Sequence, residues 1–140
     1  MPEHLTHPLI QNFLAAQEIA ILATLQQDGA PLCTPMWFLA NAVSLYMFSV
    51  TNTQKVRNLK RDQRVCVVVE TGTRGAEIRG VTVQGRVEFV DNTPALQPIV
   101  HQMLQKYDPH LAALWQGAIM PPNRCMWRII PQKVYSWGLE

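Results

Sequence analysis

The sequence has 140 residues, of which 48% are hydrophobic and 16% charged, and its formal net charge is +2 at pH 7. These values predict a single globular domain over residues 1–140, with a sizeable core, and exclude a disordered chain. A net charge this small gives no argument for nucleic acid or an anionic membrane as a partner, and no apolar run approaches the roughly 18 residues of a membrane span.

The cysteines and the first residues indicate where the protein resides. Cys33, Cys66 and Cys125 are scattered and show no CxxC spacing. An odd, scattered set in apolar surroundings is typical of reduced, buried thiols in a cytoplasmic protein. No basic region followed by an apolar run opens the chain, so no signal peptide is expected. We therefore expect a cytoplasmic protein.

The first predicted elements are a helix and a strand. Apolar residues at helical spacing predict an amphipathic helix over residues 6–17, with Thr6 as its N-cap. The apolar run at 19–25 has the length of a strand and ends in a turn at 27–29.

The next two strands differ in character. Residues 31–40 include Pro31 and Pro35, which each remove a ladder donor and so favour a sheet edge or a bulge. A bulged strand frees backbone groups that can face a ligand. Residues 43–50 are mostly apolar on both faces, which predicts a central strand.

A polar corner follows this strand and leads into a short basic helix, residues 53–61. Thr53 can act as the N-cap, its hydroxyl accepting a hydrogen bond from the first turn. The remaining free N–H groups and the positive end of the helix dipole then form a small anion site. Hydroxyls of Ser49 and Thr51 on one side and Lys55 on the other would suit a phosphate monoester. The alternative is an ordinary capped surface helix.

The other basic residues of this helix have a plainer interpretation as a solvated face; they are Arg57, Lys60, Arg61 and Arg64. Nucleic-acid binding would require more basic surface or aromatic stacking residues nearby, and the pattern offers neither. Lys55 is therefore the strongest candidate for an anion contact.

The rest of the chain alternates between apolar strands, at 64–70, 80–90 and 124–137, and helices, at 91–107 and 109–115. Gly85 occupies an inward strand position and predicts a bend of the kind that a closing barrel needs. Pro131 is expected to interrupt the last strand. About six mostly antiparallel strands with segregated helices predict an α+β, mainly β, domain built on an antiparallel barrel.

The sequence offers little chemistry based on its own side chains. It contains no GxSxG, Walker A, GxGxxG or HExxH motif. His4 and His7 lack partner ligands, and His101 and His110 lack a nucleophile or an acidic partner at readable spacing, so no metal site is expected. If the protein is an enzyme, we expect a bound cofactor to carry the reaction.

Three blocks of the sequence resemble one known family: ILATLQQDGAPLCTPMWF, LYMFSVTNTQKVRNLKRDQRVCVVVE and RGVTVQGRVEFVDN, with a closing strand that ends in VYSW. Together they resemble the short, single-domain FMN-binding split-barrel proteins related to pyridoxamine 5′-phosphate oxidase, over nearly the whole chain. The resemblance implies a six-stranded antiparallel split barrel with flanking helices. It also implies a homodimer with two flavin sites at the subunit interface.

The resemblance further implies a set of cofactor-binding residues. The backbone that lines the isoalloxazine ring falls on Thr34, Pro35, Met36 and Trp37. The contacts to the ribityl phosphate fall on Ser49, Thr51, Gln54 and Lys55, with Asn58 in support. The second subunit would contribute Arg128 and Trp137 from its closing strand, although tryptophans in such positions also serve packing.

Two departures argue against vitamin B6 oxidation. The chain ends at SWGLE without the Arg-x-His substrate motif, and Gly80 stands where true oxidases tend to carry a glutamine. The leading hypothesis is an FMN-dependent oxidoreductase that moves a hydride or an electron pair through the flavin to a small-molecule substrate. The alternatives are a reductase using the deazaflavin coenzyme, which binds a phosphate at the same corner, a non-catalytic flavin or haem binder with a stress role, and a purely structural module.

Overall fold

In the computed structural model, which describes residues 3–139, seven strands form one antiparallel sheet. The strands are β1 (Ala20–Leu25), β2 (Pro31–Met36), β3 (Leu39–Ala40), β4 (Leu45–Val50), β5 (Arg64–Thr71), β6 (Arg79–Val90) and β7 (Arg124–Trp137). The helices are α1 (Pro8–Ala16), α2 (Gln54–Arg61), α3 (Gln97–Lys106) and α4 (His110–Trp115), with short 3-10 turns at Gly75–Glu77 and Pro94–Leu96. The strand order is β2-β1-β5-β6-β7-β4-β3.

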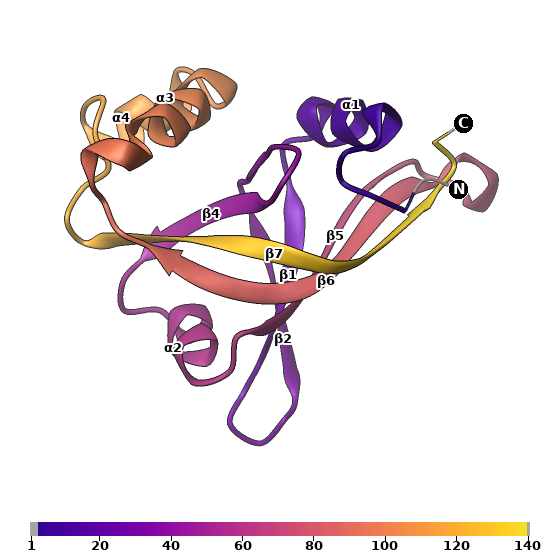
Figure 1. Ribbon diagram of the computed structural model, residues 1–140, viewed down its shortest axis with the longest axis horizontal. Helices are drawn as coiled ribbons and strands as arrows, with labels where there is room; N and C mark the ends of the chain where they lie inside the picture. The colour runs from indigo at the N-terminus through magenta and orange to yellow at the C-terminus, as the bar shows by residue number, and fades with distance from the viewer. Residues whose placement is uncertain (1–2, 140) are drawn as a thin grey trace.

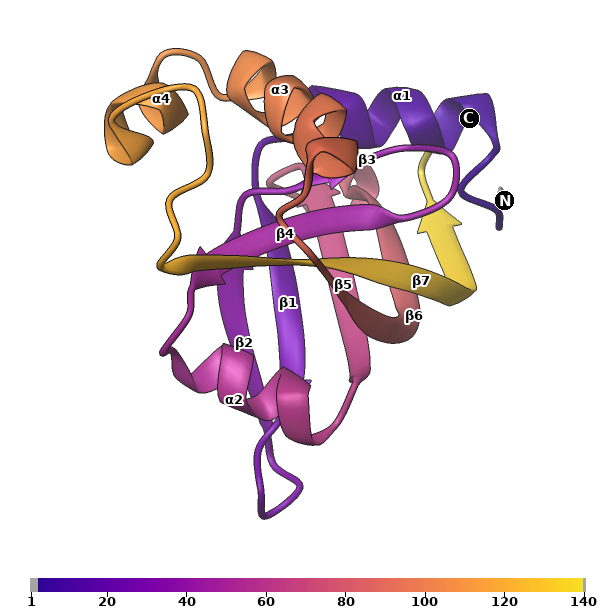
Figure 2. The same ribbon diagram turned by 60° about the vertical axis from the view of Figure 1, so that its left-hand side comes forward.

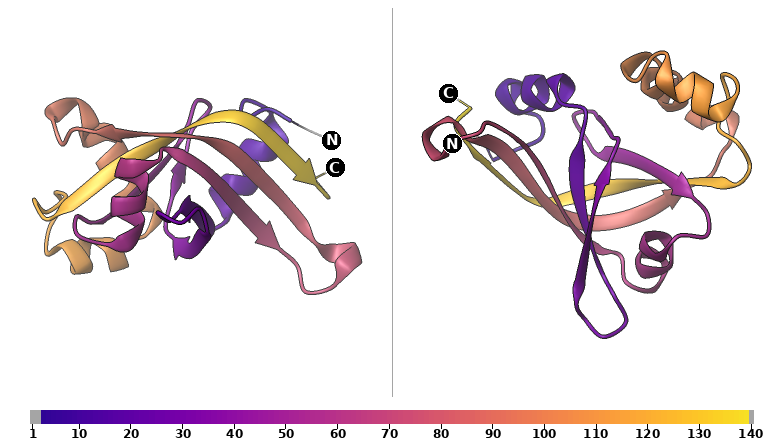
Figure 3. Two further views of the ribbon diagram at one scale, coloured as in Figure 1. Left: turned by 90° about the horizontal axis from the view of Figure 1, so that it is seen from below. Right: turned by 180° about the vertical axis from the view of Figure 1, so that it is seen from behind.

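The sheet curls into a half-barrel. Figure 1 shows α1 and α3 above the sheet and α2 below it, and seen from behind in Figure 3, β1 and β2 cross β4 and β7. The predicted bend lies at Gly85, where the register between β6 and β7 shifts. A Cβ there would collide with the carbonyl oxygen of Ile130, so only glycine fits. The predicted fold class, mainly β with flanking helices on an antiparallel barrel, is confirmed.

Two strands differ from the prediction. The expected strand 31–40 is divided, because the chain leaves the sheet at Trp37 and Phe38, so there are seven strands rather than six. This two-residue bend joins the two edges of the curled sheet, β2 and β3. The predicted interruption at Pro131 was wrong, because β7 continues through it and the register shift absorbs the disturbance.

The core lies inside the half-barrel. Alternate residues of the strands point inward, and α1 and α2 cover its two ends with buried side chains such as Leu14 and Leu59. A second cluster packs α3 and α4 against the outside of β4 and β7. Leu96, just before α3, and Val100 and Met103 within it are all buried in this cluster.

Two smaller expectations were also wrong. The N-cap of α1 is His7, whose Nδ1 accepts a hydrogen bond of 3.1 Å from the amide of Leu9, and not Thr6. The three cysteines are free, but Cys33 is exposed because it lies on the outer side of the edge strand β2, and Cys66 and Cys125 are half-buried. Among the described residues, no helix is long and apolar enough to cross a membrane.

Candidate cofactor site

The polar corner between β4 and α2 is held by its own hydroxyl groups. Ser49 is 9% exposed, and its Oγ lies 3.3 Å from Oγ1 of Thr53. Oγ1 of Thr53 also donates to the carbonyl of Val50, at 3.4 Å. Thr51 is exposed, and its amide donates to the carbonyl of Asn123, at 3.0 Å, which fixes the backbone of the corner.

The N-terminus of α2 differs from the prediction in one respect. Thr53 is the N-cap residue, as expected, but its side chain makes no capping hydrogen bond, because its hydroxyl is directed back to the corner. The first turn of α2 contains no acidic residue. The amides of this turn are therefore left to an anion or to water, and the helix dipole favours an anion.

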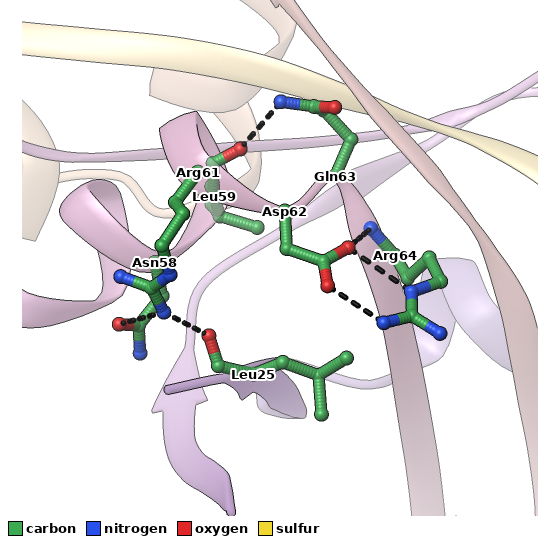
Figure 4. A network of polar contacts seen from close by, with 7 residues as sticks. All are labelled: Leu25, Asn58, Leu59, Arg61, Asp62, Gln63 and Arg64. Carbon is green, nitrogen blue, oxygen red and sulfur yellow. Dashed lines mark hydrogen bonds and ion pairs between the residues drawn. The ribbon is translucent and has the colours of Figure 1, made fainter. Parts of the chain in front are cut away.

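Four of the five basic residues on and just after α2 contact other groups of the described chain, and one, Lys55, does not. Arg57 donates to the carbonyl of Asn52, and Arg61 donates to the carbonyl of Leu25 at 2.6 Å, as Figure 4 shows. Nζ of Lys60 lies 5.9 Å from the ring centroid of Phe89.

Arg64 is engaged as well. It forms an ion pair of 2.8 Å with Asp62, and its hydrogen bonds lower the pKa of that carboxyl to about 2 (Figure 4). Lys55 stands apart from these residues. It is half-buried, and its ammonium has no hydrogen bond, ion pair or ring contact anywhere in residues 3–139. It is the cation of the corner that is free to bind a phosphate.

Asn58 has a structural place that the sequence did not reveal. It is fully buried, and its Nδ2 donates to Oγ1 of Thr24 on β1, at 3.0 Å. Its Oδ1 accepts hydrogen bonds from Gln54, at 2.9 Å, and from Arg61, at 3.2 Å. Asn58 therefore fastens α2 to the sheet and orients Gln54 at the start of the helix. Thr24 could not be recognised from the sequence, because it is a single hydroxyl residue inside an apolar strand.

The second part of the predicted site lies on β2. This strand pairs with β1 only and is at one end of the strand order, so its other backbone edge is free of ladder partners. Thr34 and Met36 point inward and Pro35 points outward, while Trp37 lies half-buried in the bend. Oγ1 of Thr34 is buried and has no hydrogen-bond partner within the described part of the chain. The free backbone groups of this edge and the Thr34 hydroxyl could form hydrogen bonds with a planar polar ring.

The residues expected from a second subunit are engaged within the chain. Nη2 of Arg128 donates to Oε1 of Glu88 at 2.7 Å. The ring of Trp137 lies against Gly80, where a Cβ would come within 2.6 Å of Trp137 Cζ2. The absence of a side chain at Gly80 thus makes room for Trp137. No cluster of three or more potential metal ligands occurs in residues 3–139.

Comparison with known proteins identifies the family. The family profile described as pyridoxamine 5′-phosphate oxidase matches residues 6–138, which is nearly the whole sequence. The chain belongs to this family. No curated protein gave a match.

Solved structures share the fold. The conserved hypothetical protein Rv2991 of Mycobacterium tuberculosis is 28% identical, with a TM-score of 0.79, and the match covers 94% of this chain and 83% of that one. The heme storage protein HutZ of Vibrio cholerae is 17% identical, with a TM-score of 0.77 and 93% of each chain covered. A FAD-binding protein of Mesorhizobium loti is 24% identical, with a TM-score of 0.72, covering 90% of this chain and 87% of that one.

Proposed function

We propose that the protein binds FMN, with the phosphate at the corner between β4 and α2 and the ring along the free edge of β2. The observation that carries the proposal is Lys55, a half-buried ammonium without a partner beside an uncapped helix N-terminus. Both features favour a phosphate group. The family supports a flavin, and the M. loti structure is described as FAD-binding.

Each proposed contact has a definite role. Lys55 supplies the charge for the phosphate, while the hydroxyl of Thr51 and the first amides of α2 supply donors. Ser49 and Gln54 are already hydrogen-bonded within the corner, so they shape it before the ligand arrives. Asn58 holds the helix in place from below. This pre-formed corner reduces the ordering that binding requires.

The ring would lie where β2 offers backbone groups. The free edge at Thr34, Pro35 and Met36 presents carbonyl and amide groups that orient the ring, although Pro35 supplies only its carbonyl. The orphaned hydroxyl of Thr34 adds a further polar contact. Trp37 contributes an apolar wall that excludes water.

We propose an oxidoreductase activity in which bound FMN supplies hydride or electron-pair transfer to a small-molecule substrate. The protein positions and shields the ring, because the corner and β2 contain no carboxylate or histidine that could act as a general acid or base. Pyridoxamine-phosphate oxidation is not proposed, because the ring of Trp137 fills the space that a side chain at position 80 would need.

The protein is further proposed to be a cytoplasmic homodimer that buries the outer face of the sheet. On this face Ile21, Val68 and Cys66 are half-buried, and Tyr135 is 46% exposed. Open cavities of about 380 and 320 Å³ lie on it. Apolar surface of this kind is typical of an interface.

The charges at the two ends of this face support the same proposal. Glu70 lies at one end of the outer face of β5 and Arg64 at the other. A twofold axis that runs across the strands would bring the acidic end of one copy to the basic end of its partner. Light scattering at micromolar concentration should give the mass of a dimer. A protein that is monomeric in this measurement and still binds FMN would contradict an FMN site shared between two subunits.

Titration with two ligands tests the phosphate site. FMN and riboflavin share the ring and differ in the phosphate. Lys55→Ala should weaken FMN binding about tenfold to a hundredfold, because a charge-assisted hydrogen bond contributes about 1.5–3 kcal/mol. It should leave riboflavin binding unchanged. Lys60→Ala, which removes the same charge further along α2, is the matched control and should change neither affinity.

The same titration distinguishes the alternatives. If wild-type protein quenches neither FMN nor riboflavin fluorescence, the flavin proposal is wrong. If the deazaflavin coenzyme displaces FMN at lower concentration, the protein is a deazaflavin-dependent reductase. If the absorption spectrum of the isolated protein is that of haem, the protein is a haem binder, and HutZ, a heme storage protein, shares its fold.

A further inference from the structure

The hydroxyl of Tyr107, at the end of α3, lies between two strands far from it in the sequence. It is 2.8 Å from the carbonyl oxygen of Glu18, and 2.9 Å from both the amide nitrogen and the carbonyl oxygen of Phe38. Glu18 comes just before β1, and Phe38 comes just after β2. The residue is 4% exposed, so water does not compete for these bonds.

This hydroxyl replaces the backbone hydrogen bonds that one further residue pair of β1 and β2 would make. The β1–β2 register ends at the pair Ala20 and Met36, and two residues further out it would join Glu18 to Phe38. At that position the strands separate instead, and the hydroxyl accepts from the amide of Phe38 and donates to a carbonyl. Tyr107 therefore provides hydrogen bonds for the amide of Phe38 and the carbonyl of Glu18, which have no partner in the β1–β2 ladder. The chain can then turn from β2 into β3.

Lys106 completes the arrangement. A phenol has one proton and cannot donate to two carbonyls at once. Nζ of Lys106 donates to the carbonyl of Phe38 at 3.0 Å, which leaves the proton of Tyr107 for Glu18. The same ammonium lies 3.7 Å from the centroid of the Phe38 ring.

Both residues of the bend are thus held by the end of α3. The ring of Trp37 stacks on that of Tyr107, with centroids 4.4 Å apart and planes 12° apart. Phe38 is bound through its amide, its carbonyl and its ring. Figure 2 shows α3 lying over the side of the sheet where β3 and β4 run. The bend would otherwise be a two-residue linker without ladder hydrogen bonds.

We propose that Tyr107 and Lys106 are positioning residues, which fix the Trp37–Phe38 bend and thereby set Met36 and Trp37 against the bound cofactor. The part that concerns the cofactor rests on the proposed function, and the part that concerns the bend does not. Tyr107→Phe keeps the aromatic stack and removes the hydroxyl, so it tests the hydrogen bonds alone. Tyr46→Phe is the matched control, because this half-buried tyrosine of β4 lies opposite Leu39, next to the bend, but makes no hydrogen bond to Trp37 or Phe38.

The first measurement uses protein without cofactor. Acrylamide quenching of Trp37 is obtained as the difference between each protein and its Trp37→Phe counterpart. Tyr107→Phe should raise the quenching constant of Trp37 about twofold or more and reduce its near-ultraviolet circular dichroism, whereas Tyr46→Phe should do neither. Lys106→Met should act like Tyr107→Phe, and Lys106→Arg, which retains a donor, should restore the wild-type values. Unchanged Trp37 signals in Tyr107→Phe would overturn the proposal.

The second measurement is FMN binding. Tyr107→Phe should weaken FMN about tenfold and riboflavin by the same factor, because the bend concerns the ring and not the phosphate. Lys55→Ala should weaken FMN but not riboflavin, so comparing the two ligands separates an effect on the phosphate contact from an effect on the ring. Equal flavin affinities in Tyr107→Phe and wild type would overturn the positioning role. Absence of flavin binding in the wild type would instead refute the proposed function, and the quenching experiment would still decide the role of Tyr107 in the bend.

Discussion

Replacing Asn58 with alanine should destabilise the protein through one buried hydrogen bond. Asn58 is fully buried, and its amide is the donor to the hydroxyl of Thr24, which is itself 1% exposed. Losing this bond removes about 1 kcal/mol, and leaving a buried polar group unsatisfied costs about 1–3 kcal/mol more. Gln54 and Arg61 also lose an acceptor, but both are exposed and can bond to water. We expect a total loss of about 2–4 kcal/mol.

Urea denaturation of single and double variants measures this loss. Since a protein of this size shifts its melting temperature by about 3 °C per kcal/mol, Asn58→Ala should also melt about 6–12 °C lower. In Thr24→Val the partner hydroxyl is absent, so adding Asn58→Ala should then cost about 1 kcal/mol less than in the wild type. All proteins are compared at one concentration, because dimerisation shifts apparent stability. A loss below about 0.5 kcal/mol for Asn58→Ala would refute the reasoning.

Three other predictions concern different regions of the chain. Gly80→Ala places a Cβ 2.6 Å from the ring of Trp137, so the ring should move outward, with a red-shifted emission and a loss of about 1–3 kcal/mol in unfolding free energy. Burial lowers the pKa of Lys106 to about 8 and raises that of Tyr107 to about 12. Lys106 should therefore make the free energy of unfolding rise from about pH 8 toward 10.5, because the unfolded chain binds more protons in this range. Tyr107 should make it fall above about pH 10, because there the folded chain binds more protons. Cys33, which is exposed on the proposed dimer face, should be alkylated more slowly as the protein concentration rises.

Each of these predictions has its control. Gly75→Ala meets no atom within 4 Å and should leave tryptophan emission unchanged; a similar emission in the Gly80 variant would contradict the contact. Lys106→Met should remove the rise in stability above pH 8, which urea denaturation at several pH values measures, and a rise that persists would assign it to another group. Mass spectrometry follows the alkylation of Cys33, and a rate independent of protein concentration would place the interface elsewhere.

The sequence predicted those parts of the fold that short-range patterns determine. The alternation in β6, the start of α2 after Thr53 and the inward glycine at position 85 each depend on neighbouring residues, and the structure contains all three features. The division of the strand 31–40 could not be predicted, because Tyr107, which hydrogen-bonds to the bend at Phe38, lies about 70 residues further along the chain.

The candidate site shows the same limit. Lys55 emerged from the sequence as the strongest anion contact, and the structure shows that the surrounding arginines are engaged with backbone carbonyls and with Asp62. Those partners are set by tertiary structure. The capping role of Thr53 was wrong for a related reason, since Ser49 and Val50 compete for its hydroxyl. A pattern shows which groups are available, but it does not show which partner each one takes.

The identity of the chromophore that remains bound through purification tests the central claim most directly. Absorption spectroscopy of the isolated protein, followed by mass spectrometry of the compound released on denaturation, identifies it. We expect FMN, in amounts that approach one per chain, and a much reduced amount in Lys55→Ala. A haem or deazaflavin chromophore, or equal FMN content in the two proteins, would contradict the proposed site.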